Sequence, residues 1–370
     1  MRKNMSENPQ AFIQIREISK HFGDVIAVNK VDLDIKKGEL FSILGASGSG
    51  KTTLLRMMAG LEIPTEGKIF IDGIDMTNVP PYKRPVNIMF QSYALFPHMT
   101  VFDNIAYGLR KEGITKVKID DKVRKMLALV KLSDYGKRTP NQLSGGQSQR
   151  VALARSLIKE PKVLLLDEPL AALDKKLRQS TQFELMDIQE ELGVTFVIVT
   201  HDQEEAMTLS DRIAVMEEGE FVQIGTPNSI YEHPNSKFVA DFIGNINMFD
   251  AKVISSGEQG LNITCKALGG DIVMKNSSQT IHATDLSVAL RPEKVIIDKQ
   301  QPSNENIDYV SGVVEDFGYF GNLSIFRVRT TNGDIIQVSK QNRVRIEDTI
   351  TWEDQVYLSW EPESLILLDK

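Results

Sequence analysis

The sequence has a single cysteine, Cys265, so the chain cannot form an internal disulfide. An oxidising compartment is therefore not needed for folding. No uninterrupted apolar run is long enough to cross a bilayer, and Met1 to Glu7 lack the apolar core of a secretory signal. These absences predict a chain that stays in the cytoplasm unless a partner holds it at a membrane.

The sequence also lacks an excess of basic residues. It has 43 Lys and Arg against 50 Asp and Glu, which leaves a formal charge of -7. This balance gives no electrostatic reason for a nucleic-acid footprint, so we expect no nucleic-acid partner. There is no tandem repeat and no sustained heptad pattern. The length of 370 residues exceeds what one compact core usually organises, which indicates two domains.

Residues 11–243 are expected to form an α/β domain. Short apolar runs with the character of buried strands alternate there with helical periods. Leu40 to Leu44 precede the helical run Thr52 to Ala59, and Val163 to Leu166 precede the helical run Asp174 to Leu192. This alternation is typical of a parallel sheet covered by helices.

Residues 244–370 have a different pattern. The segments are short, rich in strand-forming residues and separated by turn residues, as in Ser324 to Arg329 and Ile335 to Val338. Asn332 and Gly333 between these two segments indicate a tight hairpin. We expect a small all-β barrel or sandwich.

A glycine-rich loop follows the strand expected over Leu40 to Leu44. It fits the pattern GxxxxGK[ST] without a gap, in Gly45, Ala46, Ser47, Gly48, Ser49, Gly50, Lys51 and Thr52. The glycines let backbone N–H groups curl around phosphate oxygens, and the next helix presents its positive end to the same anion. The motif predicts an ATP site in which Lys51 contacts the β and γ phosphates and Thr52 is a ligand of Mg²⁺.

Two carboxylates follow the second apolar run, Val163 to Leu166. Adjacent strand residues point to opposite sides, so Asp167 and Glu168 are expected to have different roles. We expect Asp167 to hold the Mg²⁺ shell and Glu168 to orient and partly deprotonate the water that attacks the γ-phosphate. Alone, the two acids would equally fit a solvated strand end. The phosphate loop upstream favours the catalytic interpretation.

A second anion-binding surface is predicted at Leu143 to Gln147, which reads LSGGQ and stands directly before the helical run Val151 to Ile158. The Ser144 hydroxyl and open N–H groups meet there at a helix start. By itself the segment would fit a helix cap. Together with the phosphate loop and the run LLLDEP, it resembles the nucleotide-binding domain of ABC ATPases. The resemblance implies that this second cradle closes over ATP held by a partner subunit.

The resemblance also implies roles for four other residues. Gln91 matches the glutamine that links Mg²⁺ and the attacking water to the membrane partner, and His201 matches the switch histidine that contacts the γ-phosphate. Asp174 matches the aspartate of a loop that crosses the dimer interface. Phe22 matches the aromatic that stacks on adenine, although a core position would also fit it.

The predicted site thus has three sets of residues. The catalytic set is Glu168, His201 and Gln91. The Mg²⁺ ligands are Thr52, Gln91 and Asp167. The residues expected to bind ATP are Phe22, Gly45, Ala46, Ser47, Gly48, Ser49, Gly50, Lys51, Thr52, Thr53, Ser144, Gly145, Gly146, Gln147 and Asp174.

The C-terminal part resembles the OB-like TOBE module of importer ATPases, through Ala289 to Glu293 and Phe317 to Gly321. The phrases Val79 to Tyr82 and Met89 to Thr100 are similar to those of the polyamine importer group, with putrescine favoured over spermidine. Most of these phrases also occur in sugar and ferric-iron importers, which are the alternatives. A non-transport ABC ATPase that serves as a soluble switch or scaffold is a further alternative.

The resemblance implies an assembly at the cytoplasmic face of the bacterial inner membrane. The expected partners are a second copy of this chain, two transmembrane permease subunits and an external substrate-binding protein. ATP would close the homodimer, and hydrolysis would let it open. A helical subdomain over about residues 92–141 is expected to dock on the permease and pass on this motion.

Overall fold

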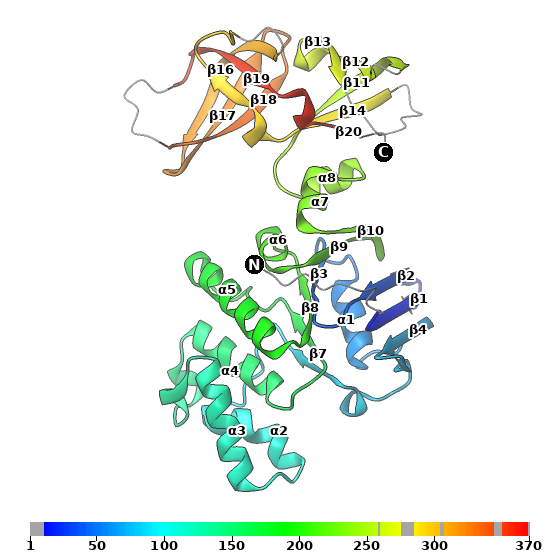
Figure 1. Ribbon diagram of the computed structural model, residues 1–370, viewed down its shortest axis with the longest axis vertical. Coiled ribbons are helices and arrows are strands. Elements are labelled where there is room, and N and C mark those ends of the chain that lie inside the picture. The colour runs from blue at the N-terminus through cyan, green and yellow to red at the C-terminus, as the bar shows by residue number, and fades with distance from the viewer. Residues whose placement is uncertain (1–10, 258–259, 275–284, 304–306, 344–349, 369–370) are drawn as a thin grey trace. The chain divides into compact units, whose positions relative to one another are not determined.

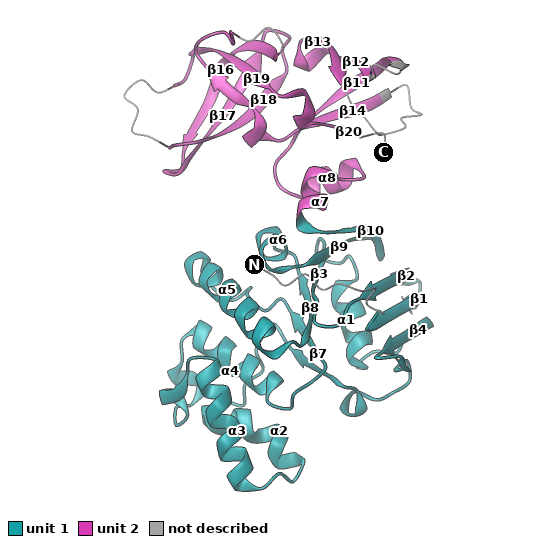
Figure 2. Ribbon diagram, viewed as in Figure 1, with its two compact units in different colours: residues 1–227 teal, residues 228–370 magenta. Residues whose placement is uncertain are grey.

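The computed structural model describes residues 11–257, 260–274, 285–303, 307–343 and 350–368 (Figure 1). The opening segment Met1 to Glu7 lies outside them. The chain divides into two compact units, residues 1–227 and 228–370 (Figure 2). No helix of the described residues is long and apolar enough to cross a membrane. The predicted succession of an α/β part and an all-β part is confirmed.

The first unit is built on a six-stranded sheet in the order β10-β9-β3-β8-β7-β6. Its strands are β3 (Leu40–Leu44), β6 (Val86–Met89), β7 (Val163–Asp167), β8 (Thr195–Thr200), β9 (Arg212–Glu217) and β10 (Glu220–Gly225). Strand β10 pairs antiparallel with β9, and the other neighbours are parallel. Because the carboxyl ends of parallel strands share one edge, the loops after β3, β6, β7 and β8 meet there.

Alternate residues of the central strands enter two different cores. Leu164 and Leu166 of β7 face a core built with the helices α2 (Val101–Lys111), α3 (Lys116–Leu129), α4 (Gly145–Leu157) and α5 (Lys175–Leu192). Leu165 faces the other core, which contains α1 (Lys51–Ala59). The sheet is therefore covered on both faces, which explains its unbroken apolar strands.

The second core is closed by an antiparallel sheet in the order β2-β1-β4-β5. Its strands are β1 (Ile13–Phe22), β2 (Val25–Ile35), β4 (Glu66–Ile71) and β5 (Ile74–Asp75). Apolar and polar residues alternate along β2, with burial of Val31, Leu33 and Ile35 on one face. That alternation is the pattern of a sheet with one face in the core.

Helices α2 and α3 both lie within the segment 92–141, which is the predicted helical subdomain. Thr100 directly precedes α2 and caps it, since its hydroxyl accepts a hydrogen bond from the Asp103 N–H. Such a cap satisfies one of the unpaired donors of a first helical turn. Short 3₁₀ turns are present in this unit at η1 (Pro81–Lys83), η2 (Ser133–Tyr135) and η3 (Pro140–Gln142). Helix α6 (Gln203–Leu209) follows β8.

The second unit contains two five-stranded antiparallel sheets, in the orders β13-β12-β11-β14-β20 and β15-β19-β16-β17-β18. The strands are β11 (Asn247–Gly257), β12 (Gly260–Cys265), β13 (Gly270–Met274), β14 (Asp285–Leu290), β15 (Ile296–Asp298), β16 (Asp308–Tyr319), β17 (Leu323–Thr330), β18 (Ile335–Gln341), β19 (Gln355–Trp360) and β20 (Leu365–Leu368). The 3₁₀ turns are η4 (Lys266–Leu268), η5 (Pro292–Lys294) and η6 (Pro362–Ser364). The predicted hairpin at Asn332 and Gly333 is confirmed, since β17 pairs antiparallel with β18 and Gly333 has a φ of 90°. Both sheets share one apolar core.

Two short helices, α7 (Pro227–Glu232) and α8 (Lys237–Phe242), belong largely to the second unit. The reason is Arg291, whose side chain is fully buried and stacks 4.2 Å from the centroid of the Tyr231 ring. Its guanidinium donates hydrogen bonds to the carbonyl oxygens of Tyr231, Ala240, Ile243 and Asn245. The compact units therefore divide at residues 227/228, just after the first residue of α7. The sequence predicts a domain boundary at 243/244, which stays a prediction.

Candidate active site

The phosphate loop lies between β3 and α1, as predicted. Gly50 has a φ of 102°, and a Cβ atom there would come within 2.3 Å of the Ala27 carbonyl oxygen. A Cβ atom at Gly45 would come equally close to the Met216 carbonyl oxygen. The loop is therefore pressed against neighbouring backbone, and only glycine fits at these two positions.

Lys51 is buried at the start of α1. Its ammonium donates hydrogen bonds to the Ala46 carbonyl oxygen at 2.7 Å and to the Ser49 hydroxyl at 3.3 Å. Burial lowers the pKa of Lys51, while the nearby carboxylates of Glu168 and Asp167 act in the opposite direction. The loop thus holds a cation inside its own curve, where the β and γ phosphates are expected.

The predicted Mg²⁺ ligands Thr52 and Asp167 are neighbours. The Thr52 hydroxyl donates to an Asp167 carboxylate oxygen at 3.3 Å. Burial raises the pKa of Asp167, and the hydrogen bond from Thr52 opposes this effect. A hydroxyl and a carboxylate oxygen are the hard donors that Mg²⁺ prefers, so these two residues fit the ion.

The three predicted catalytic residues meet at the Glu168 carboxylate. The Gln91 amide donates to one oxygen at 2.7 Å, and Nδ1 of His201 lies 2.8 Å from the other. These residues follow β6, β7 and β8, so the shared edge of the sheet brings them together. Glu168 has a left-handed backbone with a φ of 46°, an arrangement that costs energy and is concentrated at functional sites.

The bend at Glu168 modifies one expectation. Asp167 is the last residue of β7, and the backbone bends at Glu168, whose N–H donates to the Val199 carbonyl oxygen at 2.8 Å. Asp167 contacts the phosphate-loop residue Thr52, whereas Glu168 contacts Gln91 and His201. The two acids therefore have separate surroundings, although Glu168 lies one residue beyond the strand.

The LSGGQ segment forms the first turn of α4. The Ser144 hydroxyl accepts a hydrogen bond from the Gln147 N–H at 3.3 Å, and the Gln147 side chain accepts one from the Ser144 N–H at 3.0 Å. This reciprocal cap is a capping box. Gly146 packs against Leu177, where a Cβ atom would lie 2.9 Å from a leucine methyl group. In the described chain, the predicted second anion-binding surface is thus a helix start. Its hydrogen bonds are made within the first turn of α4, and its glycine packs against α5.

Asp174 caps α5 by accepting a hydrogen bond from the Leu177 N–H at 3.0 Å. Phe22, at the end of β1, is 49% exposed, and the Lys20 ammonium lies 4.9 Å from its ring centroid. That exposure excludes the core position that the sequence left open for Phe22. An exposed ring is the arrangement that stacking on a base requires.

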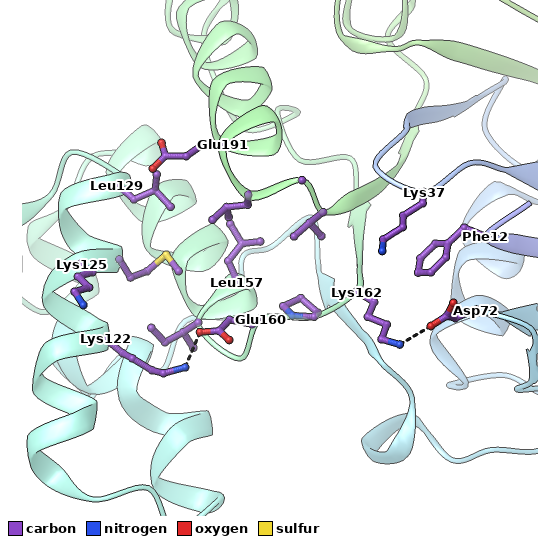
Figure 3. Close-up of a pocket in the computed structure, with 16 residues that line it drawn as sticks. Phe12, Lys37, Asp72, Lys122, Lys125, Leu129, Leu157, Glu160, Lys162 and Glu191 are labelled. Carbon is purple, nitrogen blue, oxygen red and sulfur yellow. Dashed lines mark hydrogen bonds and ion pairs between the residues drawn. The ribbon is translucent and has the colours of Figure 1, made fainter. Parts of the chain in front are cut away.

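A cavity of about 600 Å³ lies at the opposite end of the strands (Figure 3). Lys37 precedes β3 and Lys162 precedes β7, and both line it together with apolar side chains such as Leu157. Lys162 forms an ion pair with Asp72 at 2.5 Å, which Figure 3 marks with a dashed line. This cavity holds none of the predicted site residues and is separate from the phosphate loop.

Sequence reasoning did not find two groups that touch the site. One is Arg155, which donates hydrogen bonds at 2.7 Å to the carbonyl oxygens of Tyr93 and Ala94, just after Gln91. The other is a set of polar residues that flank His201, among them Glu205. Glu205 is buried, and burial of a charged side chain is a signal that only the fold reveals.

The fold and the site together define a phosphate-loop ATPase with a second, all-β module. Residues 28–171 match the family model described as ABC transporter, and residues 288–368 match the model described as TOBE domain. Both matches agree with the predicted fold class, an α/β ABC ATPase part followed by an all-β TOBE part, which is confirmed.

The relatives are similar over nearly the whole chain. The putrescine transport ATP-binding protein PotG of Escherichia coli is 49% identical over 96% of this chain and 94% of its own length. The spermidine/putrescine import ATP-binding protein PotA of Thermotoga maritima is 44% identical over 96% of this chain and 98% of its own. The chain therefore belongs to the ABC transporter ATP-binding proteins, in the group of the polyamine importers, and is an ATPase coupled to transport.

Solved structures resemble the first unit. An ATP-binding cassette solved as a dimer in a post-hydrolysis state, with ADP and phosphate bound, is 33% identical and covers 58% of this chain and 98% of its own, with a TM-score of 0.52. CbiO1 from Clostridium perfringens, part of the ABC transporter complex CbiONQ, is 30% identical and covers 60% of this chain and 90% of its own, with a TM-score of 0.57. The ADP and phosphate bound to the first of these structures agree with the phosphate site predicted around Lys51.

Proposed function

We propose that this chain hydrolyses ATP to drive polyamine import, with putrescine as the preferred substrate. The observation that carries the ATPase part is the Glu168 carboxylate held by both Gln91 and His201 beside the phosphate loop. The polyamine part is supported by the relatives, which are putrescine and spermidine/putrescine import ATP-binding proteins. The 49% identity to the putrescine protein is the reason for preferring that substrate.

The geometry supports a division of work among the residues. The loop glycines and Lys51 bind the phosphates, and Phe22 offers its exposed ring to adenine. Mg²⁺, held by Thr52 and Asp167 with Gln91, would supply positive charge at the phosphate oxygens. Glu168 accepts hydrogen bonds and orients the attacking water, while His201 holds the carboxylate and reaches the γ-phosphate.

A second copy of the chain would complete the site. The start of α4 at Ser144 presents a helix dipole and N–H groups, which favour an anion. The γ-phosphate on one copy would meet Ser144 to Gln147 of the other, with Asp174 at the interface. Closure would then depend on the γ-phosphate, and its release would let the halves separate. This arrangement makes ATP binding the power stroke of the importer.

The membrane assembly follows from the same proposal. Two permease subunits and an external substrate-binding protein would recognise the polyamine, while this chain would act at the cytoplasmic face and bind no nucleic acid. The helical segment 92–141 would contact the permease. Tyr93 is buried in it, and its hydroxyl lies 3.4 Å from the Pro169 carbonyl oxygen. It is therefore a candidate for transmission inside the unit rather than for the docking surface.

The test is uptake of labelled putrescine, spermidine, maltose and ferric iron by cells that lack this chain and then receive it again. We expect the returned chain to restore putrescine uptake most, spermidine uptake less, and sugar and iron uptake not at all. Restoration of sugar or iron uptake would contradict the polyamine assignment.

The matched variant Glu168→Gln keeps the shape of the side chain but removes the carboxylate. We expect it to bind ATP as the natural chain does, to lose at least about 100-fold in ATP turnover and to restore no uptake. It should also accumulate as a closed dimer with ATP. Normal turnover by this variant would remove Glu168 from the proposed role.

A further inference from the structure

A carboxyl group that the proposed reaction does not use is buried next to His201. The Glu205 side chain, on α6, is almost fully enclosed, with 2% of the residue exposed. One carboxyl oxygen accepts a hydrogen bond from the Thr200 hydroxyl at 2.6 Å. The other is buried without a hydrogen-bond partner among the residues that the structure describes. Such burial is costly, so the position requires an explanation.

Glu205, Thr200 and Asp202 form a closed ring of hydrogen bonds on either side of His201. The Thr200 hydroxyl, which donates to Glu205, accepts a hydrogen bond from the Asp202 N–H at 3.0 Å. An Asp202 carboxylate oxygen accepts one in turn from the Glu205 N–H at 3.0 Å. Thr200 and Asp202 are the residues immediately before and after His201. The ring therefore fixes the backbone on both sides of the histidine.

The ring is anchored to the segment that carries Asp174. The other Asp202 oxygen contacts the Arg178 guanidinium, and Arg178 also donates to the Leu173 carbonyl oxygen at 3.2 Å. Arg178 is on α5, one turn after Asp174. The position of the His201 turn is thus tied to the loop proposed to face the second copy.

We propose that Glu205 is a positioning residue for ATP hydrolysis, which fixes the turn Thr200 to Asp202 and thereby holds Nδ1 of His201 against Glu168. This inference rests on the proposed roles of His201 and Glu168. A small or apolar residue at position 205 would leave the Thr200 hydroxyl without its acceptor, so the turn would lose one side of its support. The His201 ring would then sample positions away from the carboxylate.

Histidine NMR tests the positioning directly, because the chain has only five histidines. The variants are Glu205→Ala, Glu205→Gln and Thr200→Val, with Glu204→Ala as the matched control on the neighbouring, exposed residue. We expect the His201 resonance to shift in Glu205→Ala and Thr200→Val while the other four stay in place. Glu205→Gln keeps an acceptor oxygen and should resemble the natural chain.

An unmoved His201 resonance in both Glu205→Ala and Thr200→Val would overturn the proposal. A shift of all five histidine resonances together in Glu205→Ala would show that this variant has lost its structure, and the His201 resonance of Thr200→Val then decides alone.

Steady-state ATP hydrolysis gives the second readout. We expect Glu205→Ala to lower kcat about tenfold with KM for ATP within about twofold, and Glu205→Gln to restore most of kcat. Inclusion of Glu168→Gln separates two failures. If Glu168→Gln is inactive but Glu205→Ala keeps its full kcat, only the positioning role is wrong. If Glu168→Gln hydrolyses ATP normally, the proposed function itself is wrong.

Discussion

Gly48 and Gly50 of the phosphate loop both have left-handed backbones, with φ of 86° and 102°, but their surroundings differ. A Cβ atom at Gly48 would meet nothing within 4 Å, whereas one at Gly50 would come within 2.3 Å of the Ala27 carbonyl oxygen. The cost of a left-handed backbone can therefore be measured separately from the cost of a steric clash, at two positions of the same loop.

We expect Gly48→Ala to lower the free energy of unfolding by about 1–2 kcal/mol, the cost of a left-handed residue. Gly50→Ala should cost about 1–3 kcal/mol more, because the loop must also move away from Ala27. Urea unfolding of both variants, followed by far-ultraviolet circular dichroism, measures the difference. Equal destabilisation would show that the contact with Ala27 relaxes freely.

Glu205 makes the stability of the first unit depend on pH. Burial raises the pKa of its carboxyl from 4.5 to about 7, and the hydrogen bond from Thr200 opposes this only in part. The charges of Asp202, Arg178 and Glu168 also affect the pKa of Glu205, and Glu205 in turn affects the pKa of Tyr93. Because the folded chain holds this proton more tightly than the unfolded chain, the contribution is favourable below pH 4.5 and is lost as the pH rises towards 7.

Glu205→Gln removes this dependence. Between pH 4.5 and pH 8 the variant should gain stability relative to the natural chain, by up to about 3 kcal/mol. Thermal unfolding of both proteins at pH 5 and pH 8 measures the change in their difference. A difference that stays constant with pH would mean that Glu205 has an ordinary pKa.

At the scale of elements, Arg155 joins α4 to the segment after β6. The two residues whose carbonyl oxygens it binds, Tyr93 and Ala94, have left-handed backbones with φ of 60° and 44°. The guanidinium also lies 5.5 Å from the Phe96 ring centroid. A strained turn next to Gln91 is therefore held by the helix that begins with LSGGQ.

We expect Arg155→Lys to lower ATP turnover about tenfold, because an ammonium cannot reproduce the planar fork that binds two carbonyl oxygens. ATP affinity should change less than about twofold, since Arg155 does not touch the phosphate loop. Arg150→Lys is the matched control, on the same helix but paired with Glu184. Equal turnover in both variants would contradict a role for Arg155 in holding Gln91.

The same elements show what sequence reasoning reaches. The phosphate loop and the LSGGQ segment are each an unbroken stretch of sequence in which one loop leads into one helix. The structure of each motif therefore follows from local chemistry. The meeting of Gln91, Glu168 and His201 was predictable because each follows a parallel strand. The contacts of Arg155 were not, because its partners are the backbone carbonyl oxygens of Tyr93 and Ala94, which no residue pattern marks in the sequence. Only the folded chain brings such pairs together.

At the scale of the whole molecule, both tryptophans, Trp352 and Trp360, belong to the second unit, whereas the phosphate loop belongs to the first. Tryptophan fluorescence therefore follows the second unit alone. A nonhydrolysable ATP analogue at 100 times its Kd should raise the midpoint of the helical circular dichroism signal by about 5–10 °C. The fluorescence midpoint should move by less than about 1 °C.

Lys51→Ala is the control for this experiment, because it removes the ammonium that is proposed to bind the phosphates. Neither midpoint should move in that variant. A joint rise of both midpoints in the natural chain would show that the two units unfold as one.

Arg291 also bears on how the polypeptide is synthesised and where its gene can be divided. The ribosome completes α8 well before it adds Arg291, which lies 51 positions beyond Ala240. Until Arg291 is added, the carbonyl oxygens of this segment lack the guanidinium that donates hydrogen bonds to them in the folded chain. A gene fragment that stops after codon 243 would encode the two short helices without the side chain that secures them. A fragment that stops after codon 227 would not encode these two helices, so no carbonyl oxygen would lack its hydrogen bond from Arg291.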